Sequence, residues 1–94
     1  RGQNAKRMTL RSYVLAARLE EVAGKMTMAR KVIAQGCELC PRSEDVWLES
    51  ARLNSRDNAK MVLARAIQFQ SQSVAIWLRA MSLEIEALDA ANAA

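Results

Sequence analysis

The chain has 94 residues, 51% of them hydrophobic but only 4% aromatic, with three glycines, one proline and a formal net charge of +4. This length allows one small domain, and the composition is typical of packed helices. No apolar run approaches the roughly eighteen residues that cross a bilayer, and no signal-peptide pattern opens the chain, so we expect a soluble intracellular protein without a membrane segment.

Five helices are expected along the chain, after a flexible lead-in over residues 1–7, which show no period. Gly24 and Pro41 are expected to end the first two helices, and Ser43 and Asp57 to cap the third and fourth. The alanine-rich end, residues 90–94, is expected to fray. Helical spacing of apolar and small residues places the helices at roughly 8–22, 26–40, 44–53, 57–70 and from 74 onward.

The chain contains an internal repeat with an offset of thirty residues. Each of six apolar or small positions recurs once, and a period of roughly 20 to 50 residues with helical spacing inside it is typical of helical-repeat scaffolds, which bind partners and rarely catalyse. The first copy consists of Ala29, Val32, Ile33, Gly36, Cys37 and Trp47, and the second consists of Ala59, Val62, Leu63, Ala66, Ile67 and Trp77.

The first, third and fifth helices form a second series of equivalent positions. We therefore expect an all-α fold of antiparallel helical hairpins stacked as an α-solenoid. One repeat covers residues 8–41, a second covers 42–71, and 72–94 supply the first helix of a further, incomplete repeat. The repeat-defining residues are the positions above apart from Cys37, together with Pro41 and the aligned sets Tyr13, Ala17, Leu19; Trp47, Ala51, Leu53; and Trp77, Met81, Leu83.

Gly36 lies in the middle of the second expected helix, where glycine costs about 1 kcal/mol relative to alanine. This cost is understandable if a neighbouring helix comes close, so we expect Gly36 to lie against the backbone or a small side chain of that helix. Ala66 at the equivalent position agrees with this interpretation.

The residues give no support for an enzyme. The sequence has no histidine, which removes the commonest general base and metal ligand. Cys37 and Cys40 form a Cys-x-x-Cys pattern, but both fall in the last turn of a helix, where the dipole disfavours a thiolate, so we interpret them as core residues. Neighbouring Glu20 and Glu21 are interpreted as a surface face. We assign no catalytic, cofactor or metal site.

Basic residues are concentrated at the start of the chain, where residues 1–25 carry six basic and two acidic side chains. This excess could contact RNA weakly or bind an acidic partner, but no stacking aromatics lie among the charges, so solvated helix faces are the simpler interpretation.

The pattern resembles the half-a-TPR (HAT) repeat class. In the first helix of a pair, the shared features are an early aromatic and a Leu-Glu end. In the second they are Ala-Arg, a β-branched pair and a terminal proline, although Ser71 stands where the second repeat would have that proline. The resemblance is closest to helical-repeat splicing scaffolds and covers roughly residues 15–86. It implies a nuclear, non-catalytic fragment of a scaffold that bridges snRNP proteins of the spliceosomal tri-snRNP.

Two alternatives stay open: a helical-repeat RNA-binding protein and a general TPR-type adaptor. A repeat that reads one base per unit needs a nearly constant period. The spacing here is 34 residues from Tyr13 to Trp47 and 30 from Trp47 to Trp77. Whichever function holds, we expect the isolated chain to self-associate, because the fifth helix would leave its apolar stripe uncovered, namely Trp77, Ala80, Met81 and Leu88.

Overall fold

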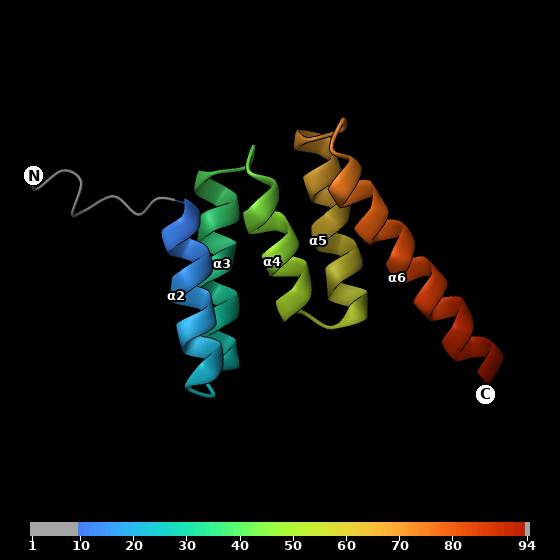
Figure 1. Ribbon diagram of the computed structural model, residues 1–94, viewed down its shortest axis with the longest axis horizontal. Coiled ribbons are helices and arrows are strands. Elements are labelled where there is room, and N and C mark those ends of the chain that lie inside the picture. The colour runs from blue at the N-terminus through green and yellow to red at the C-terminus, as the bar shows by residue number, and fades with distance from the viewer. Residues whose placement is uncertain (1–9, 94) are drawn as a thin grey trace, which may run out of the picture.

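The computed structural model describes residues 10–93, which form five helices and no strand within that range. Successive helices run in opposite directions and lie in a row, with α2 and α6 at its two ends (Figure 1). The predicted all-α solenoid is confirmed, while the expected lead-in over 1–7 and the start of the first helix at residue 8 fall outside the described residues. The helices are α2 (Leu10–Val22), α3 (Met26–Leu39), α4 (Glu44–Leu53), α5 (Arg56–Phe69) and α6 (Val74–Ala93).

The first helix ends in a Schellman motif built on Gly24. Its φ of 82° lies in the left-handed region that favours glycine. The amide of Gly24 donates to the carbonyl of Glu21 at 3.0 Å, and the amide of Lys25 donates to the carbonyl of Glu20 at 2.8 Å. The predicted stop at Gly24 is therefore confirmed.

The turns that follow α3 and α5 have the same geometry. The cap residues Cys40 and Gln70 have φ/ψ of −130°/59° and −137°/60°, and each donates its amide to a carbonyl four residues earlier at 2.8 Å. In both turns the residue three positions later donates back to the cap carbonyl at 3.0 Å. Ser71 therefore replaces Pro41 without changing the point at which the helix ends.

One of the expected helix caps needs correction, and the other is confirmed in its position. The N-cap of α5 is Ser55, not Asp57, because the helix already begins at Arg56; the Ser55 hydroxyl accepts from the amide of Asn58 at 3.4 Å. Ser43 occupies the N-cap position of α4 but makes no side-chain capping bond.

The expected fraying of residues 90–94 is also wrong as far as residue 93, because α6 continues to Ala93. Alanine is the best helix former, so a helix that has already begun extends readily through this segment.

The central helix α4 is packed on two faces. One contains Trp47 and Ala51 and packs on helices later in the chain; we call it the forward face. The other contains Val46, Ser50 and Leu53 and packs on earlier helices; we call it the rear face. All five side chains are at most 5% exposed. The forward face meets α5 and α6, and the rear face meets α2 and α3.

Helix α2 has only its forward face covered among the described residues. Tyr13 and Ala17 are buried, but Leu19 is 72% exposed, whereas its counterparts Leu53 and Leu83 are 3% exposed. Leu19 occupies the same position of the repeat as Leu53 and Leu83, but unlike them it is not buried. Its position belongs to the rear face, and no earlier helix of the described chain packs there.

Helix α6 shows the opposite arrangement. Its rear face is covered, with Ile76 and Leu83 at most 3% exposed, while Trp77 and Met81 on the forward face are 48% and 57% exposed. The remaining repeat-defining positions on α3 and α5 fill the core or pack against it: Ala29, Val32, Ile33 and Gly36 on α3, and Ala59, Val62, Leu63, Ala66 and Ile67 on α5.

Candidate protein-interaction surfaces

The indole of Trp47 shows how a covered forward face is built. Its Nε1 donates to the carbonyl oxygen of Pro41 at 2.8 Å. Phe69 of α5 stacks on the ring with a centroid separation of 5.9 Å, and the guanidinium of Arg65 lies 5.8 Å from the ring centroid. The turn before α4 thus orients the ring, and the next helix covers it.

Trp77 repeats the first half of this arrangement. Its Nε1 donates to the carbonyl oxygen of Ser71 at 2.8 Å, six residues earlier, as in the first copy. The acceptor is a backbone oxygen, so the exchange of Pro41 for Ser71 leaves the bond intact. The predicted equivalence with Trp47 is confirmed by this contact. The ring of Trp77, however, is 48% exposed.

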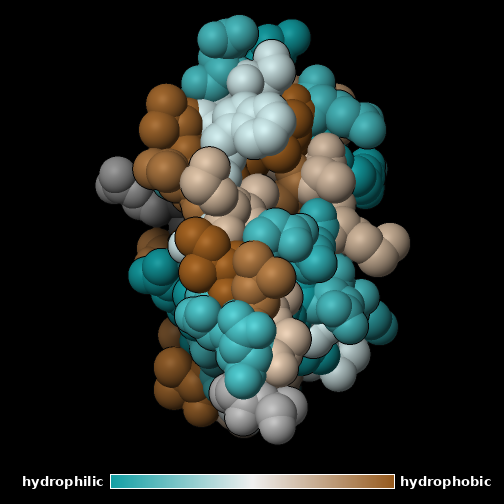
Figure 2. Space-filling model, turned by 90° about the vertical axis from the view of Figure 1, so that its right-hand side faces the viewer, coloured by the Kyte–Doolittle hydropathy of each residue, from teal (hydrophilic) through white to brown (hydrophobic). Residues whose placement is uncertain are grey.

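The uncovered face of α6 carries an apolar stripe. Its members follow one another at steps of 3, 1, 3, 4 and 3 residues, which places them on one side of the helix. Figure 2 views the molecule from this end and shows brown and tan surface interrupted by teal hydrophilic surface. Ala80, which the sequence assigned to this stripe, packs instead against the core. The α6 stripe consists of Val74, Trp77, Leu78, Met81, Ile85 and Leu88, each between 48% and 69% exposed.

A groove separates α3 from α5. No Cα atom of one helix lies within 8 Å of a Cα atom of the other, and both pack on α4. Two adjoining hollows of about 450 Å³ and 160 Å³ share four lining residues: Ala34, Ser50, Met61 and Val62. We call this the α3–α5 groove. Sequence analysis did not predict this groove, because it depends on the distance between two helices whose backbones are not in contact.

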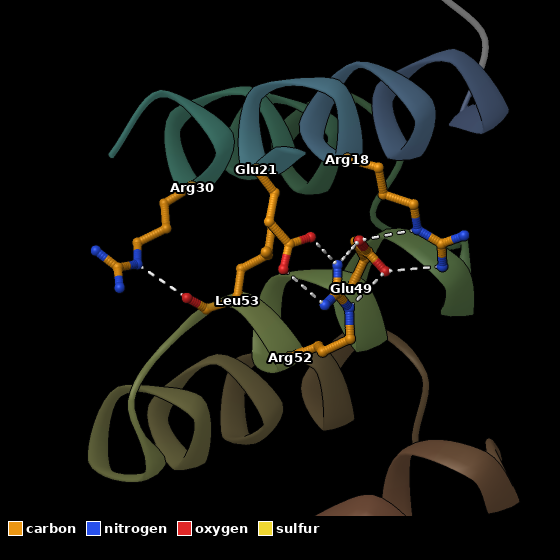
Figure 3. Close-up of polar contacts among 6 residues, drawn as sticks. All are labelled: Arg18, Glu21, Arg30, Glu49, Arg52 and Leu53. Carbon is orange, nitrogen blue, oxygen red and sulfur yellow. Dashed lines mark hydrogen bonds and ion pairs between the residues drawn. The ribbon is translucent and has the colours of Figure 1, made fainter. Parts of the chain in front are cut away.

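An ion cluster joins α2 to α4 (Figure 3). Glu49 is 5% exposed and accepts from Arg18 at 3.3 Å and from Arg52 at 2.6 Å. Arg52 also donates to Glu21 at 2.7 Å. Burial raises the pKa of the Glu49 carboxyl, but hydrogen bonds from Arg52 and Arg18 outweigh this effect and hold its pKa below the usual value. Hydrogen bonding from Arg52 likewise lowers the pKa of Glu21.

Sequence reasoning missed this cluster and treated Glu21 as part of a surface face. One signal was available. Arg18 and Glu49 are 31 residues apart, which is close to the repeat period, so they belong to neighbouring helices of the same series. The cluster ties two hairpins together, and all four of its charged groups are engaged with one another, which indicates a structural role.

Gly36 lies where two helices approach α3. A Cβ atom at this position would come within 3.0 Å of Tyr13 Cβ and 3.3 Å of Val46 Cγ1. The predicted close approach is confirmed, but its cause differs from the expectation. The neighbours are side chains of α2 and α4, and one of them is the base of a large aromatic residue.

The two cysteines lie in the structure as free thiols. Cys37 is 7% exposed, and its Sγ lies 3.5 Å from the carbonyl oxygen of Val46. Burial raises the pKa of the Cys37 thiol to about 11, which disfavours the reactive thiolate. Cys40 is half-buried. Residues 10–93 contain no group of three or more side chains of the types that hold a metal ion. In the same range, no helix has the length and apolarity needed to cross a membrane.

Comparisons with known proteins give one repeat family and one group of relatives. Residues 10–53 match the tetratricopeptide repeat. The chain is 52% identical over 75 residues, 80% of its length, to Pre-mRNA-processing factor 6 of Homo sapiens. It is 51% identical over 75 residues to Pre-mRNA-splicing factor prp1 of Schizosaccharomyces pombe, and 45% identical over 74 residues to Pre-mRNA-splicing factor 6 of Saccharomyces cerevisiae. It spans about 8% of the length of each relative.

Proposed function

Because the chain belongs to the tetratricopeptide-type helical repeats and closely resembles a short stretch of these splicing factors, we propose that it is part of a non-catalytic protein scaffold in pre-mRNA splicing. In this proposal it acts in the nucleus and binds other snRNP proteins, and so helps to bridge components of the spliceosomal tri-snRNP. The names of the relatives support the process, and the repeat architecture supports the role of a scaffold.

The observation that carries the role of a scaffold is the repeated helical hairpin, in which Trp77 reproduces the backbone bond that Trp47 makes. Trp77 is oriented by its bond to Ser71 in the chain on its own. A side chain that is already fixed loses less conformational entropy on binding. Tryptophan is also enriched among the residues that contribute most to protein interfaces. An apolar stripe around such a residue is a surface on which another helix can pack, either from a further repeat or from another protein.

A chimera tests this proposal. The segment of Saccharomyces cerevisiae Pre-mRNA-splicing factor 6 that the chain matches, 74 residues in the alignment, would be replaced by the corresponding residues of this chain, and cell growth and intron removal would be measured. We expect the chimera to support splicing and Trp77→Asp to block it, because a charge would then lie in the apolar interface. Gln68→Asp, at an exposed position of α5 outside the stripe, is the matched control and should splice normally.

The result that would reject the proposal is a chimera that accumulates to normal levels in the nucleus but leaves introns unprocessed. Affinity purification adds a second readout. A tagged chimera should retain the spliceosomal small nuclear RNAs and their proteins, and the Trp77→Asp chimera should lose them.

Direct RNA contact through the basic N-terminal part is the alternative. One of those basic side chains, Arg18, already forms an ion pair with Glu49 within the chain. Titrating single-stranded RNA into the purified chain at several salt concentrations separates the two cases, because phosphate contacts weaken steeply as salt increases. Tight, salt-sensitive binding would favour the RNA-binding alternative over a purely protein scaffold.

Self-association of the isolated chain is a second part of the proposal. An open stripe on α6 and an exposed rear face on α2 leave apolar surface at both ends of the row. Analytical ultracentrifugation at micromolar concentrations should show dimers or larger species, and Trp77→Asp should reduce them. A monomer at every concentration would contradict this part.

A further inference from the structure

The α3–α5 groove is a second surface, separate from the α6 stripe. The two helices form its walls, and Ser50 of α4 and Asn54, the residue after that helix, line it between them. Ala34, Met61 and Val62 supply apolar lining to both hollows. A volume of about 450 Å³ falls in the range of pockets that hold a ligand or a few side chains. The groove therefore offers an apolar bed, open to solvent, that can take a short segment of chain.

One end of the groove is basic. Arg30 and Lys31 line it from the first half of α3, and among the described residues neither of them forms an ion pair. At the other end the charges already compensate one another, because Arg65 lies 3.7 Å from the carboxylate of Glu38. The groove thus has an uncompensated positive charge at one end only.

Arg30 is held in place by the backbone. Its Nε donates to the carbonyl oxygen of Leu53 at 2.9 Å. Figure 3 shows that its two terminal nitrogens point away from that bond, on the side of the guanidinium opposite to Leu53. A guanidinium fixed in this way presents a planar pair of donors that matches a carboxylate.

We propose that the α3–α5 groove binds a short acidic segment of a partner protein. A carboxylate of the segment pairs with Arg30 and Lys31, and an aliphatic side chain next to it lies on Ala34, Met61 and Val62. The inference depends on the charge and shape of this groove alone, so it stands whether or not the chain acts in splicing.

The lining favours a peptide over RNA. Proteins that hold single-stranded RNA without pairing use exposed aromatic rings on which bases stack. The one aromatic residue that lines the two hollows is Trp47, and it is 2% exposed. Aliphatic walls beside a pair of cations match alternating acidic and aliphatic side chains better than a row of phosphates.

Fluorescence anisotropy with a synthetic peptide tests the proposal. The probe is a fluorescein-labelled twelve-residue peptide of alternating glutamate and leucine pairs. One control peptide has glutamine for glutamate, and another has serine for leucine. The protein variants are Lys31→Glu and Met61→Glu, both exposed positions of the groove, and Arg42→Glu, an exposed position in the α3–α4 turn, as the matched charge control. Arg30 is left unchanged because its loss would also remove a bond to α4.

We expect the acidic leucine peptide to bind the unaltered chain and both control peptides to bind more weakly. Lys31→Glu and Met61→Glu should each raise the Kd about tenfold or more, because they place a negative charge beside the peptide's own carboxylates, whereas Arg42→Glu should change it less than about twofold. Raising the salt concentration should weaken binding to the unaltered chain more than binding to Lys31→Glu.

Three results would overturn the inference. The first is that the peptide does not bind at millimolar concentration, and the second is that it binds all three variants as tightly as the unaltered chain. The third is that single-stranded oligouridylate, tested in parallel, binds the chain and loses affinity on Lys31→Glu while the peptide does not bind. The groove would then be an RNA site. Circular dichroism of each variant confirms that the helices are intact.

Discussion

Helices α2 and α6 differ in which face is buried. In α2 the forward face is buried and the rear face is exposed, and in α6 the rear face is buried and the forward face is exposed. Tyr13 and Ala17 of α2 are buried, whereas their counterparts Trp77 and Met81 in α6 are exposed. Leu19 of α2 shows the reverse relation to its buried counterpart in α6. Helix α4, between them, has both faces covered. A position in this repeat is therefore buried or exposed according to its neighbours and not according to its residue type.

The two tryptophans separate local from tertiary effects. Both donate to a backbone carbonyl at 2.8 Å, so this bond is set by the turn that precedes the helix. Only Trp47 is covered, and the residues that cover it come from α5. Side-chain orientation is thus encoded within one turn, while burial requires a second helix.

The largest expected effect on stability comes from comparing the two tryptophans by mutation. Trp47→Ala should lower the free energy of unfolding by about 3–5 kcal/mol, because it removes a buried indole and leaves a cavity under Phe69. Trp77→Ala removes the same hydrogen bond but a side chain that is 48% exposed, so it should cost less, about 1–2 kcal/mol. Urea unfolding followed by circular dichroism measures both. Equal losses would mean that the exposed ring contributes as much as the buried one.

The next effect concerns the surface on which the forward face of α2 packs. Gly36→Leu should cost about 1–3 kcal/mol, because even a Cβ atom there would lie 3.0 Å from Tyr13. At the equivalent position in α5, Ala66→Gly should cost about 0.5–1 kcal/mol, the usual penalty for glycine in a helix. An unchanged thermal midpoint for Gly36→Leu would show that the two hairpins are packed less closely than their geometry indicates.

The rear face of α4 gives a pH-dependent test. Glu49→Gln should cost about 1–2 kcal/mol at pH 7, a modest value because both partner arginines are half exposed. The pKa of Glu49 is lowered in the folded state, so its contribution is present above the unfolded value of about 4.3 and is lost as pH falls through the folded value. The thermal midpoint of the unaltered chain should therefore fall more steeply below about pH 4 than that of Glu49→Gln.

If the thermal midpoints of the unaltered chain and of Glu49→Gln fell equally steeply as the pH is lowered, the lowered pKa of Glu49 would be contradicted. At the equivalent position in α6 stands Arg79, whose partner Glu86 lies 3.8 Å away on the same helix. Arg79→Gln is the matched control. It should change the free energy of unfolding by no more than about 0.5 kcal/mol at any pH, because an exposed ion pair within one helix contributes little.

The smallest expected effect on stability tests whether the turns after α3 and α5 are equivalent. Ser71→Pro should stabilise the chain by about 0.4–1 kcal/mol, because proline restricts the unfolded chain and the preceding residue already has the conformation found before Pro41. Pro41→Ser should lower stability by a similar amount. Both are measured by the shift in thermal midpoint. If Ser71→Pro lowered the midpoint, the matching dihedral angles of Cys40 and Gln70 would not reflect interchangeable turns.

Most of the fold could be predicted from sequence because its signals are local or periodic. The stop at Gly24 follows from a glycine after an apolar stripe, and the equivalence of Trp47 and Trp77 follows from a fixed offset. The helix count follows from the same spacing. Such signals need no knowledge of which helices finally touch.

The features that were missed depend on contacts between distant parts of the chain. Glu49 looks like an exposed residue until Arg18, 31 positions away, is brought beside it. Leu19 matches its buried counterparts in sequence but lacks their neighbours. The choice of Ser55 over Asp57 as the cap was a shift of two residues, which is within the usual uncertainty of helix ends.

The polar bonds around α4 have a mechanical consequence. At one end of α4, the carbonyl oxygen of Pro41 accepts from the side chain of Gln70 at 3.2 Å as well as from Trp47. At the other end, Arg30 bonds to Leu53 and Arg52 bonds to Glu21. Anchors at both ends of one helix resist torsion as well as bending. Two hairpins joined in this way should move as one rigid body, so that a force that rotates one hairpin rotates the other through the same angle.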